Sequence, residues 1–470
     1  MKLTRTLFIG MLLLIVVEQA LAVMRKAPYV IYGGTNTEME ILWQLTTTAL
    51  CTFDWGRDTT YSLGTEQTVE YGSDHQHRYT IIGLVPGNEY DYRGTSGTQV
   101  FSGSFRAALA DSITRLKFLA YGDTRSNPAT HDAVANGMFS TDGSDSDYHS
   151  LVISVGDLVA DGNTESYWDS EFFSSAYPHI RSLLANLPYQ SCMGNHEGTG
   201  ILFAKYFPYP YVAHHYWSFD FGPAHFAVLD QYTSYGAGSA ELAWLAHDLA
   251  TASKPWKFIV LHEPGWSAGG DHENNVTVQT SIQPLCEQYG VSIVFGGHNH
   301  YYARAVVNGV QHITTGGGGA PLYDPNPGYP HIVVTSRSNH FCKVEIASSR
   351  LYFAAITSAG TVIDTFSVVR AVSASPGQPA PRPAGFELWP VYPNPFNASA
   401  VIRFSLPAAE HARLTVYDVN GRLVEVLTDA MLSAGDHRVT LDGSTFSSGL
   451  YFARLEAGET IQTEKMLLLK

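Results

Sequence analysis

The sequence predicts an α/β region in the middle of the chain with a small all-β sandwich on each side. Between residues 112 and 370, apolar strand-like runs alternate with helical patterns, which is typical of α/β proteins. Residues 28–107 and 386–470 instead alternate apolar and polar positions in short segments separated by turns, as small sandwiches do. Residues 371–385 are rich in Pro and small residues and are predicted to form a linker.

Four helical patterns are expected in the middle region. They cover residues 131–139, 167–186, 240–252 and 278–289. A Gly-rich stretch at 316–319 is expected to be a tight turn near the site, because no Lys-Ser/Thr pair and no helix follow it as in a phosphate-binding loop.

The composition indicates a folded protein of several domains. The chain has 470 residues, of which 45% are hydrophobic and 15% are charged, which excludes a disordered acidic tail. Its formal net charge is −15, so the surface repels phosphate backbones and no nucleic-acid-binding surface is expected. The four cysteines are widely spaced and show no CxxC metal or redox signature.

The first 22 residues have the pattern of a secretory signal peptide. Lys2 and Arg5 form a basic start, residues 7–17 form a short apolar core, and residues 20–22 have the A-x-A form of a cleavage site. The alternative is an uncleaved anchor, which Glu18 disfavours because it interrupts the apolar run. We therefore expect an exported protein with no transmembrane segment after signal cleavage.

Polar residues follow the apolar runs of the middle region in five places. These are Gly122-Asp123, Gly156-Asp157, Gly194-Asn195-His196-Glu197, His262 and Gly297-His298-Asn299-His300. In α/β proteins the carboxyl ends of core strands lie at one edge of the sheet, so these groups are expected to converge there. Asp, Asn and His are suitable ligands for hydrolytic zinc, iron or manganese, and one carboxylate can bridge two ions.

These five blocks resemble the calcineurin-like metallophosphoesterase superfamily over residues 112–370, most closely its purple acid phosphatase-like branch. The resemblance implies a four-layer α/β/β/α sandwich and two divalent or trivalent metal ions (Fe, Zn or Mn). It implies these ligands: Asp123 and His300 for the first ion, Asp157 as the bridge, and Asn195, His262 and His298 for the second ion. His196 would protonate the leaving group or stabilise its charge.

Two positions depart from that pattern. The superfamily usually has Asp-x-His in the first block, where this chain has Arg125, and the purple branch has a tyrosine where this chain has Ala160. We therefore expect a weak first metal site and no tyrosinate-to-iron colour. Arg125 is a candidate catalytic residue, because its guanidinium could bind a phosphate oxygen. The alternative is a structural ion pair with Asp161 or Asp132.

The two flanking domains carry resemblances of their own. GLVPGNEYDYR at 83–93 resembles the tyrosine corner of fibronectin type III domains, and VEYG at 69–72 resembles the form of that module fused to purple acid phosphatases. An unrelated sandwich is the alternative.

The last domain resembles the immunoglobulin-like C-terminal sorting domain of the type IX secretion system. The motifs are YPNPFN at 392–397, VYDVNGRLV at 416–424, SGLYFARL at 448–455 and KMLLLK at 465–470. The resemblance implies recognition by that secretion machinery and export across the inner and then the outer membrane, to the cell surface or beyond. A plain immunoglobulin-like domain without an export role is the alternative.

The expected function is that of a secreted phosphoesterase that hydrolyses phosphomonoesters through attack of a metal-bridged hydroxide. Phosphodiesters or nucleotides are alternative substrates. A catalytically weak, surface-displayed binding protein is a different alternative, which the flanking sandwiches and the altered first metal position would suit. The enzyme is favoured because every other expected ligand, together with His196, is present.

Overall fold

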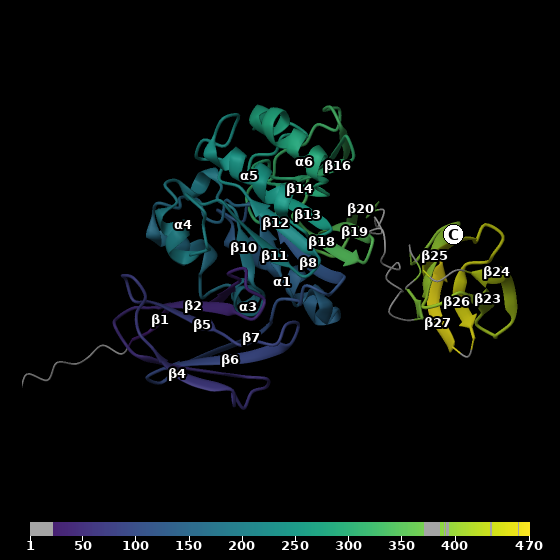
Figure 1. Cartoon of the computed structure of the whole chain (residues 1–470), viewed down its shortest axis with the longest axis horizontal. Helices are drawn as coiled ribbons and strands as arrows, with labels where there is room; N and C mark the ends of the chain where they lie inside the picture. The colour runs from purple at the N-terminus through teal and green to yellow at the C-terminus, as the bar shows by residue number, and fades with distance from the viewer. Residues whose placement is uncertain (1–21, 371–385, 390, 392–393, 433–434, 459) are drawn as a thin grey trace, which may run out of the picture. The chain divides into compact units, whose positions relative to one another are not determined.

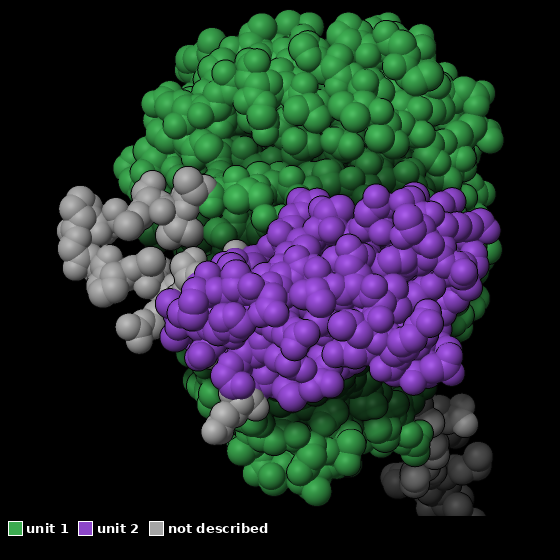
Figure 2. All heavy atoms as spheres, turned by 90° about the vertical axis from the view of Figure 1, so that its right-hand side faces the viewer, with its two compact units in different colours: residues 1–370 green, residues 371–470 purple. Residues whose placement is uncertain are grey.

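The computed structural model describes residues 22–370, 386–389, 391, 394–432, 435–458 and 460–470. The predicted linker and the predicted signal peptide, apart from Ala22, lie outside these residues. The chain divides into two compact units, residues 1–370 and 371–470, which Figure 2 colours separately. Within the described ranges, none of the helices has the length and apolarity needed to cross a membrane.

Two small sheets form the N-terminal part of the first unit. Their strand orders are β1 (Met24–Ile31), β2 (Met39–Leu45), β5 (Gln76–Ile81), and β4 (Gly64–Thr68), β3 (Cys51–Gly56), β6 (Glu89–Ser96), β7 (Gln99–Arg106). The Trp43 ring of the first sheet packs on the second, with its centroid 5.6 Å from Phe53 and 5.3 Å from Phe101. The Tyr90 hydroxyl accepts a hydrogen bond from the Val85 amide at 2.8 Å, which is the contact that a tyrosine corner requires.

Two larger sheets follow in the same unit. The first has the order β10 (Tyr189–Ser191), β9 (Val152–Ser154), β8 (Arg115–Tyr121), β18 (His340–Ala347), β19 (Arg350–Thr357), β20 (Val362–Val369). The second has the order β11 (Trp217–Phe221), β12 (Ala224–Val228), β13 (Trp256–Val260), β14 (Ile293–Gly296), β16 (Val310–Thr315), β15 (Tyr302–Val307), β17 (Ile332–Ser336). The strands that lead to the site, β8 and β9 in one sheet and β13 and β14 in the other, pair in parallel.

The two larger sheets pack face to face around aromatic rings. The Phe118 ring of β8 has its centroid 5.3 Å from Phe226, 5.4 Å from Phe258 and 6.2 Å from Phe295, which belong to β12, β13 and β14. Buried rings of this size contribute much of the apolar area that stabilises a core. The parallel strands are therefore fixed relative to one another across the sheet interface.

Helices cover the outer faces of both larger sheets (Figure 1). On the first sheet lie α1 (Pro128–Ser144) and α3 (Pro178–Asn186), and on the second lie α5 (Ala240–Thr251) and α6 (Gln283–Tyr289). The predicted α/β/β/α arrangement is confirmed. Shorter helical segments are η1 (Ser146–Tyr148), α2 (Glu165–Tyr167), η2 (Trp168–Phe172), η3 (Asn195–Glu197), α4 (Ile201–Tyr206) and η4 (Val278–Ile282).

The helix predicted over residues 167–186 is wrong as one continuous element. The structure has a short helical segment that ends at Phe172 and a separate helix, α3, that begins at Pro178. Pro178 explains the break, because proline has no amide hydrogen and is accepted at the first turn of a helix but not in its interior.

The second unit contains two further antiparallel sheets. They have the orders β21 (Glu387–Leu388), β22 (Ser399–Leu406), β25 (Gly435–Asp442), and β24 (Leu423–Leu432), β23 (Glu410–Asp418), β26 (Gly449–Ala457), β27 (Thr460–Leu468). Alternate positions of β23 and β26 are buried, among them Leu414, Val416 and Leu455, as expected for strands with one face on a core. All four cysteines of the chain are buried and unpaired.

Candidate metal centre

The expected ligands lie in turns that directly follow four parallel strands. Asp123 follows β8, Asp157 follows β9, His262 follows β13 and His298 follows β14. Asp123 and Asp157 have φ values of 55°, and His298 has a φ value of 66°. Left-handed backbone is uncommon for residues other than glycine, although Asp and His adopt it more often than most, and it occurs often at functional sites. The sheets thus hold these side chains at their carboxyl edges.

Two glycines let the carboxylates approach neighbouring turns. A Cβ atom on Gly297 would lie 2.2 Å from Asp123 Oδ2, and one on Gly194 would lie 2.3 Å from Asp157 Oδ1. Any larger residue would displace these oxygens, so glycine is required at both positions. The Gly-rich turn at 316–319 also lies close to a neighbouring turn. The amide of Gly318 donates to the carbonyl of Gly122, just before Asp123, at 2.8 Å.

Four atoms that can accept a hydrogen bond or donate a lone pair to a metal converge at the expected second metal position, and we call them the acceptor cluster. Asn195 Oδ1 lies 3.1 Å from His262 Nε2 and 3.0 Å from His298 Nδ1, and these two ring nitrogens are 3.2 Å apart. Asp157 Oδ1 is 3.4 Å from His262 Nε2. Ligands of a tetrahedral ion at 2.0–2.1 Å are separated by about 3.3 Å. The spacing therefore suits a bound cation.

The protonation of His262 supports the same conclusion. Its Nδ1 lies 2.7 Å from the Val155 carbonyl oxygen, which can only accept, so Nδ1 carries the proton. Its Nε2 then points at the oxygens of Asn195 and Asp157. When Nε2 carries no proton, three lone pairs meet there, and this arrangement is unfavourable until a cation lies between them. Burial, together with the neighbouring His262, lowers the pKa of His298 to about 2, so that ring is neutral.

The first metal position brings together Asp123, Asp157 and His300. One ligand atom from each of them lies within 4.8 Å of the other two, and His300 Nε2 is 3.6 Å from Asp123 Oδ1. The Pro321 carbonyl accepts a hydrogen bond from His300 Nδ1 at 2.8 Å, which leaves a lone pair at Nε2. The Tyr323 ring stacks on His300 with centroids 4.1 Å apart.

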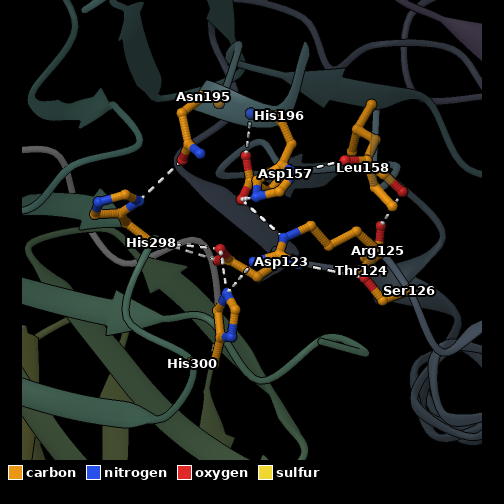
Figure 3. A network of polar contacts seen from close by, with 12 residues as sticks. Asp123, Thr124, Arg125, Ser126, Asp157, Leu158, Asn195, His196, His298 and His300 are labelled. Atoms are coloured by element: carbon orange, nitrogen blue, oxygen red, sulfur yellow. Dashed lines mark hydrogen bonds and ion pairs between the residues drawn. The ribbon is translucent and has the colours of Figure 1, made fainter. Parts of the chain in front are cut away.

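Arg125 extends into this first position. Its Nε donates to Asp157 Oδ2 at 3.2 Å, and its Nη2 lies 3.4 Å from His300 Nε2 (Figure 3). The ion pair that the sequence left as the alternative is present, but the partner is Asp157 and not Asp161 or Asp132. Asp132 binds the start of α3 and Asp161 binds the turn before α2, because both carboxylates are used to begin helices.

The two central carboxylates have opposite tendencies. Burial and the nearby charge of Asp157 raise the pKa of Asp123 well above its usual range. Burial would also raise the pKa of Asp157, but the neighbouring His262 and His196 outweigh it and lower that pKa. Negative charge is therefore concentrated on Asp157, whose two oxygens face the acceptor cluster on one side and Arg125 on the other.

His196 lies at the open side of the site. Its Nδ1 donates to the Ala160 carbonyl at 2.6 Å, and its Nε2 is 3.9 Å from Asp157 Oδ2. The side chain is 28% exposed, so Nε2 can exchange protons with solvent or a ligand. With His196, all eight candidate residues lie in one site.

Glu197 is a residue whose role sequence patterns did not reveal. Its carboxylate is fully buried and accepts amide hydrogen bonds from Asp157 at 3.0 Å, Leu158 at 2.8 Å and Gly194 at 2.6 Å. It thereby ties the turn after β9 to the turn that carries Asn195. Burial, together with the charge of Asp157, raises the pKa of Glu197 to about 8.

Glu171 also joins two turns of the site through backbone amides. It lies in η2 and accepts hydrogen bonds from the amides of Ser126 at 3.0 Å and Ala160 at 2.8 Å. It thus joins the turns after β8 and β9. No local motif marks Glu171, since its partners are backbone groups distant in sequence.

Comparison with known families agrees with this geometry. The model of the calcineurin-like phosphoesterase family matches residues 116–302, which include all eight candidate residues. The chain carries a calcineurin-like phosphoesterase domain. Residues 390–469 match the secretion system C-terminal sorting domain, in agreement with the resemblance of the last region.

Curated relatives of the phosphoesterase domain include acid phosphatases. Purple acid phosphatase 23 of Arabidopsis thaliana is 28% identical over 293 residues, which are 53% of this chain and 62% of the relative. Acid phosphatase type 7 of Mus musculus is 29% identical over 261 residues, which are 48% of this chain and 56% of the relative. The matched part is thus less than two thirds of each relative's length.

Solved structures show that the fold is shared. Purple acid phosphatase PPD1 from yellow lupin superimposes with a TM-score of 0.63 at 19% identity, covering 74% of this chain and 75% of that one. PhoD superimposes with a TM-score of 0.57 at 12% identity, covering 74% of this chain and 92% of that one. Both superpositions cover about three quarters of this chain, at identities that show the fold alone.

Proposed function

We propose that the protein is a metal-dependent phosphatase that hydrolyses phosphomonoesters outside the cytoplasm. The observation that carries this proposal is the acceptor cluster, in which Asn195 Oδ1 and Asp157 Oδ1 lie 3.1 and 3.4 Å from His262 Nε2, at the spacing of ligands around one ion. Arg125 and His196 border the same site and supply the other groups that phosphate ester hydrolysis needs. The acid phosphatases among the relatives support the same reaction class.

The acceptor cluster would hold an ion of zinc, iron or manganese. When bound, the metal supplies Lewis acidity that polarises a phosphoryl oxygen and activates water. Asp157 places its negative charge at the ion, and the backbone bonds from Glu197 keep that carboxylate in position. His262 and His298 would complete the set, each binding the ion through a ring nitrogen that carries no proton.

Arg125 and His196 act on the substrate. The guanidinium of Arg125 has five donors, of which Nε, Nη2 and Nη1 already have neighbours in Asp157, His300 and Ser126. The remaining N–H groups can bind a phosphate oxygen. Because the Ala160 carbonyl fixes the proton of His196 on Nδ1, a second proton on Nε2 faces the site and can be given to the departing alkoxide.

Ala160 determines what visible spectrum is expected of the iron-loaded protein. It stands where the purple branch has its tyrosine ligand, so the iron-loaded protein is expected to lack an intense visible charge-transfer band. A strong band in that protein would contradict the assignment of Ala160 to the ligand position.

The C-terminal unit directs export. The sorting domain indicates secretion or display at the cell surface. We propose that the signal peptide carries the chain across the inner membrane and that the type IX machinery recognises the sorting domain for passage across the outer membrane.

The direct test is phosphate release from an aryl monoester by the purified full chain. We expect hydrolysis of para-nitrophenyl phosphate that is lost with a chelator and restored by Mn²⁺, Zn²⁺ or Fe²⁺. A matched assay with bis(para-nitrophenyl) phosphate separates a phosphodiesterase from a phosphomonoesterase. If the protein hydrolyses neither ester with any of the three metals, the alternative of a catalytically weak, surface-displayed binding protein is favoured.

A further inference from the structure

The first metal position already contains a positive charge that belongs to the chain. Arg125 Nε donates to Asp157 Oδ2 at 3.2 Å, and Nη2 lies 3.4 Å from His300 Nε2. A first metal ion would have to use the same carboxylate oxygen and the same ring nitrogen. None of the four side chains of the neighbouring acceptor cluster carries a permanent positive charge.

His300 can bind either Arg125 or a metal ion, but not both. Because the Nδ1–H group donates a hydrogen bond to the Pro321 carbonyl, the neutral ring has one lone pair, at Nε2. That lone pair can accept from Arg125 or bind a metal about 2.0–2.1 Å away, but it cannot do both. An ion at that distance would also meet the guanidinium charge at close range in a buried site, which is strongly unfavourable.

The position of Arg125 is fixed by the surrounding chain. Its side chain is 14% exposed, and its Nη1 donates to Ser126 Oγ at 3.2 Å. The backbone amides of Thr124 and Arg125 both donate to the Asp157 carbonyl, at 3.0 and 3.2 Å, and Glu171 holds the next amide. The arginine therefore starts from a backbone that is already tied to Asp157.

We propose that the Arg125 guanidinium takes the place of the first metal ion, so that the chain binds one metal ion, in the acceptor cluster, next to a built-in cation. The two-ion expectation from the family resemblance is thereby revised for this chain. Asp157 and His300 then hold the guanidinium, and Asp123 accepts a hydrogen bond from the backbone amide of His298 beside it. The number of metal ions does not depend on the proposed function. Only binding of a phosphate ester by the Arg125 guanidinium rests on it.

The test is metal binding by the full chain with Mn²⁺ alone. Equilibrium dialysis followed by elemental analysis should give one ion per chain. Electron paramagnetic resonance should show the hyperfine-split signal of an isolated Mn²⁺ ion. Two ions per chain with an exchange-coupled spectrum would overturn the proposal, and so would one ion that is lost in a His300→Ala variant but kept in Asn195→Ala.

The reverse substitution sharpens this test. Arg125→His removes the guanidinium and restores Asp-x-His, so we expect two ions per chain and a coupled spectrum. Arg125→Gln, which frees the lone pairs without adding an imidazole, should admit a second, weaker ion if the histidine variant does not fold. If both variants fold and neither binds a second ion, the proposal is contradicted. The matched control is Arg93→His, since Arg93 also pairs with a carboxylate, Asp54, at 2.7 Å but in the N-terminal sheets; it should keep one ion.

Phosphate release measured on the same samples separates the two proposals. One uncoupled ion with ester hydrolysis supports both. One uncoupled ion without hydrolysis supports the arginine substitution and refutes the phosphatase. Two coupled ions with hydrolysis refute the arginine substitution and support the phosphatase.

Discussion

The two halves of the site, the acceptor cluster and the first metal position, both contain histidine and aspartate. They differ in which group faces the Nε2 nitrogen of the histidine. In the acceptor cluster, His262 Nε2 faces two oxygens with no donor between them. In the first position, His300 Nε2 faces Arg125. Both histidines have their other nitrogen fixed by a backbone carbonyl, so the difference arises from one side chain. It teaches that the residue two places after Asp123 decides whether that half of the site needs an external cation.

The largest effect is expected from His262→Ala. His262 is the member of the acceptor cluster with contacts to all three others, so its loss should remove the metal and reduce hydrolysis to the uncatalysed level. Elemental analysis and aryl phosphate turnover measure both. The control is His411→Ala, an exposed histidine of β23, which should change neither. A folded His262→Ala protein that keeps its metal would refute the acceptor cluster as the binding site.

A smaller effect is expected from His196→Ala. This change should leave the metal content unaltered and lower kcat about 100- to 10,000-fold, the range typical of a lost general acid. The loss should be greater for alkyl than for para-nitrophenyl phosphate, because a poor leaving group needs the proton more. Equal losses for both esters would argue against proton donation and for a role in binding.

Glu197→Gln should weaken the metal site without removing a ligand. The amide has one acceptor oxygen where the carboxylate has two, so one of the three backbone bonds to Asp157, Leu158 and Gly194 must be lost. We expect metal affinity to fall about 10- to 100-fold, as for other supporting residues, with kcat at saturating metal less affected. Titration with Zn²⁺ measures the affinity, and the exposed Glu66→Gln is the control. Unchanged affinity would mean that the turns are held by other contacts.

The smallest effect concerns a histidine outside both halves of the site. Burial would lower the pKa of His225, but hydrogen bonds with Asp220 and Asp248 outweigh it and raise that pKa to about 9; Lys254 lies 4.0 Å from Asp220. Because the folded pKa exceeds the unfolded value of 6.5, this stabilisation is complete below pH 6.5 and is lost as the pH rises through 9. The free energy of unfolding should fall by up to about 3 kcal/mol over that window.

Urea unfolding between pH 6 and 10 tests this histidine. His225→Gln should flatten the pH dependence of the unfolding free energy in that window. His298 and His300 make the contrast. Burial lowers their pKa values to about 2 and 4, so these two rings are neutral, whereas the raised pKa of His225 keeps that ring charged. Identical pH profiles for the two proteins would show that His225 is not charged in the fold.

Much of this arrangement is predictable from the sequence because strand ends are local features. The apolar runs before Asp123, Asp157, His262 and His298 identify the strands, and parallel pairing brings their ends together. The four layers follow from the family resemblance of these blocks. The interrupted helix was predictable in principle from Pro178, which a helical apolar pattern conceals.

Other features could not be predicted, because they depend on contacts between distant segments. Glu197 and Glu171 bind backbone amides that have no sequence signature. Arg125 pairs with Asp157 rather than with Asp161 or Asp132, because the parallel pairing of β8 and β9 brings the turns after these strands together. Which lone pairs a side chain satisfies is decided only when the strands are in register.

The central claim is that the acceptor cluster holds a metal ion while Arg125 fills the other half of the site. Anomalous diffraction from crystals of the full chain grown with Zn²⁺, recorded at the zinc edge, tests it most directly. We predict one strong peak among Asp157, Asn195, His262 and His298, and a guanidinium between Asp157 and His300. A map with no peak in the acceptor cluster, or with a second peak between Asp123 and His300, would contradict the account.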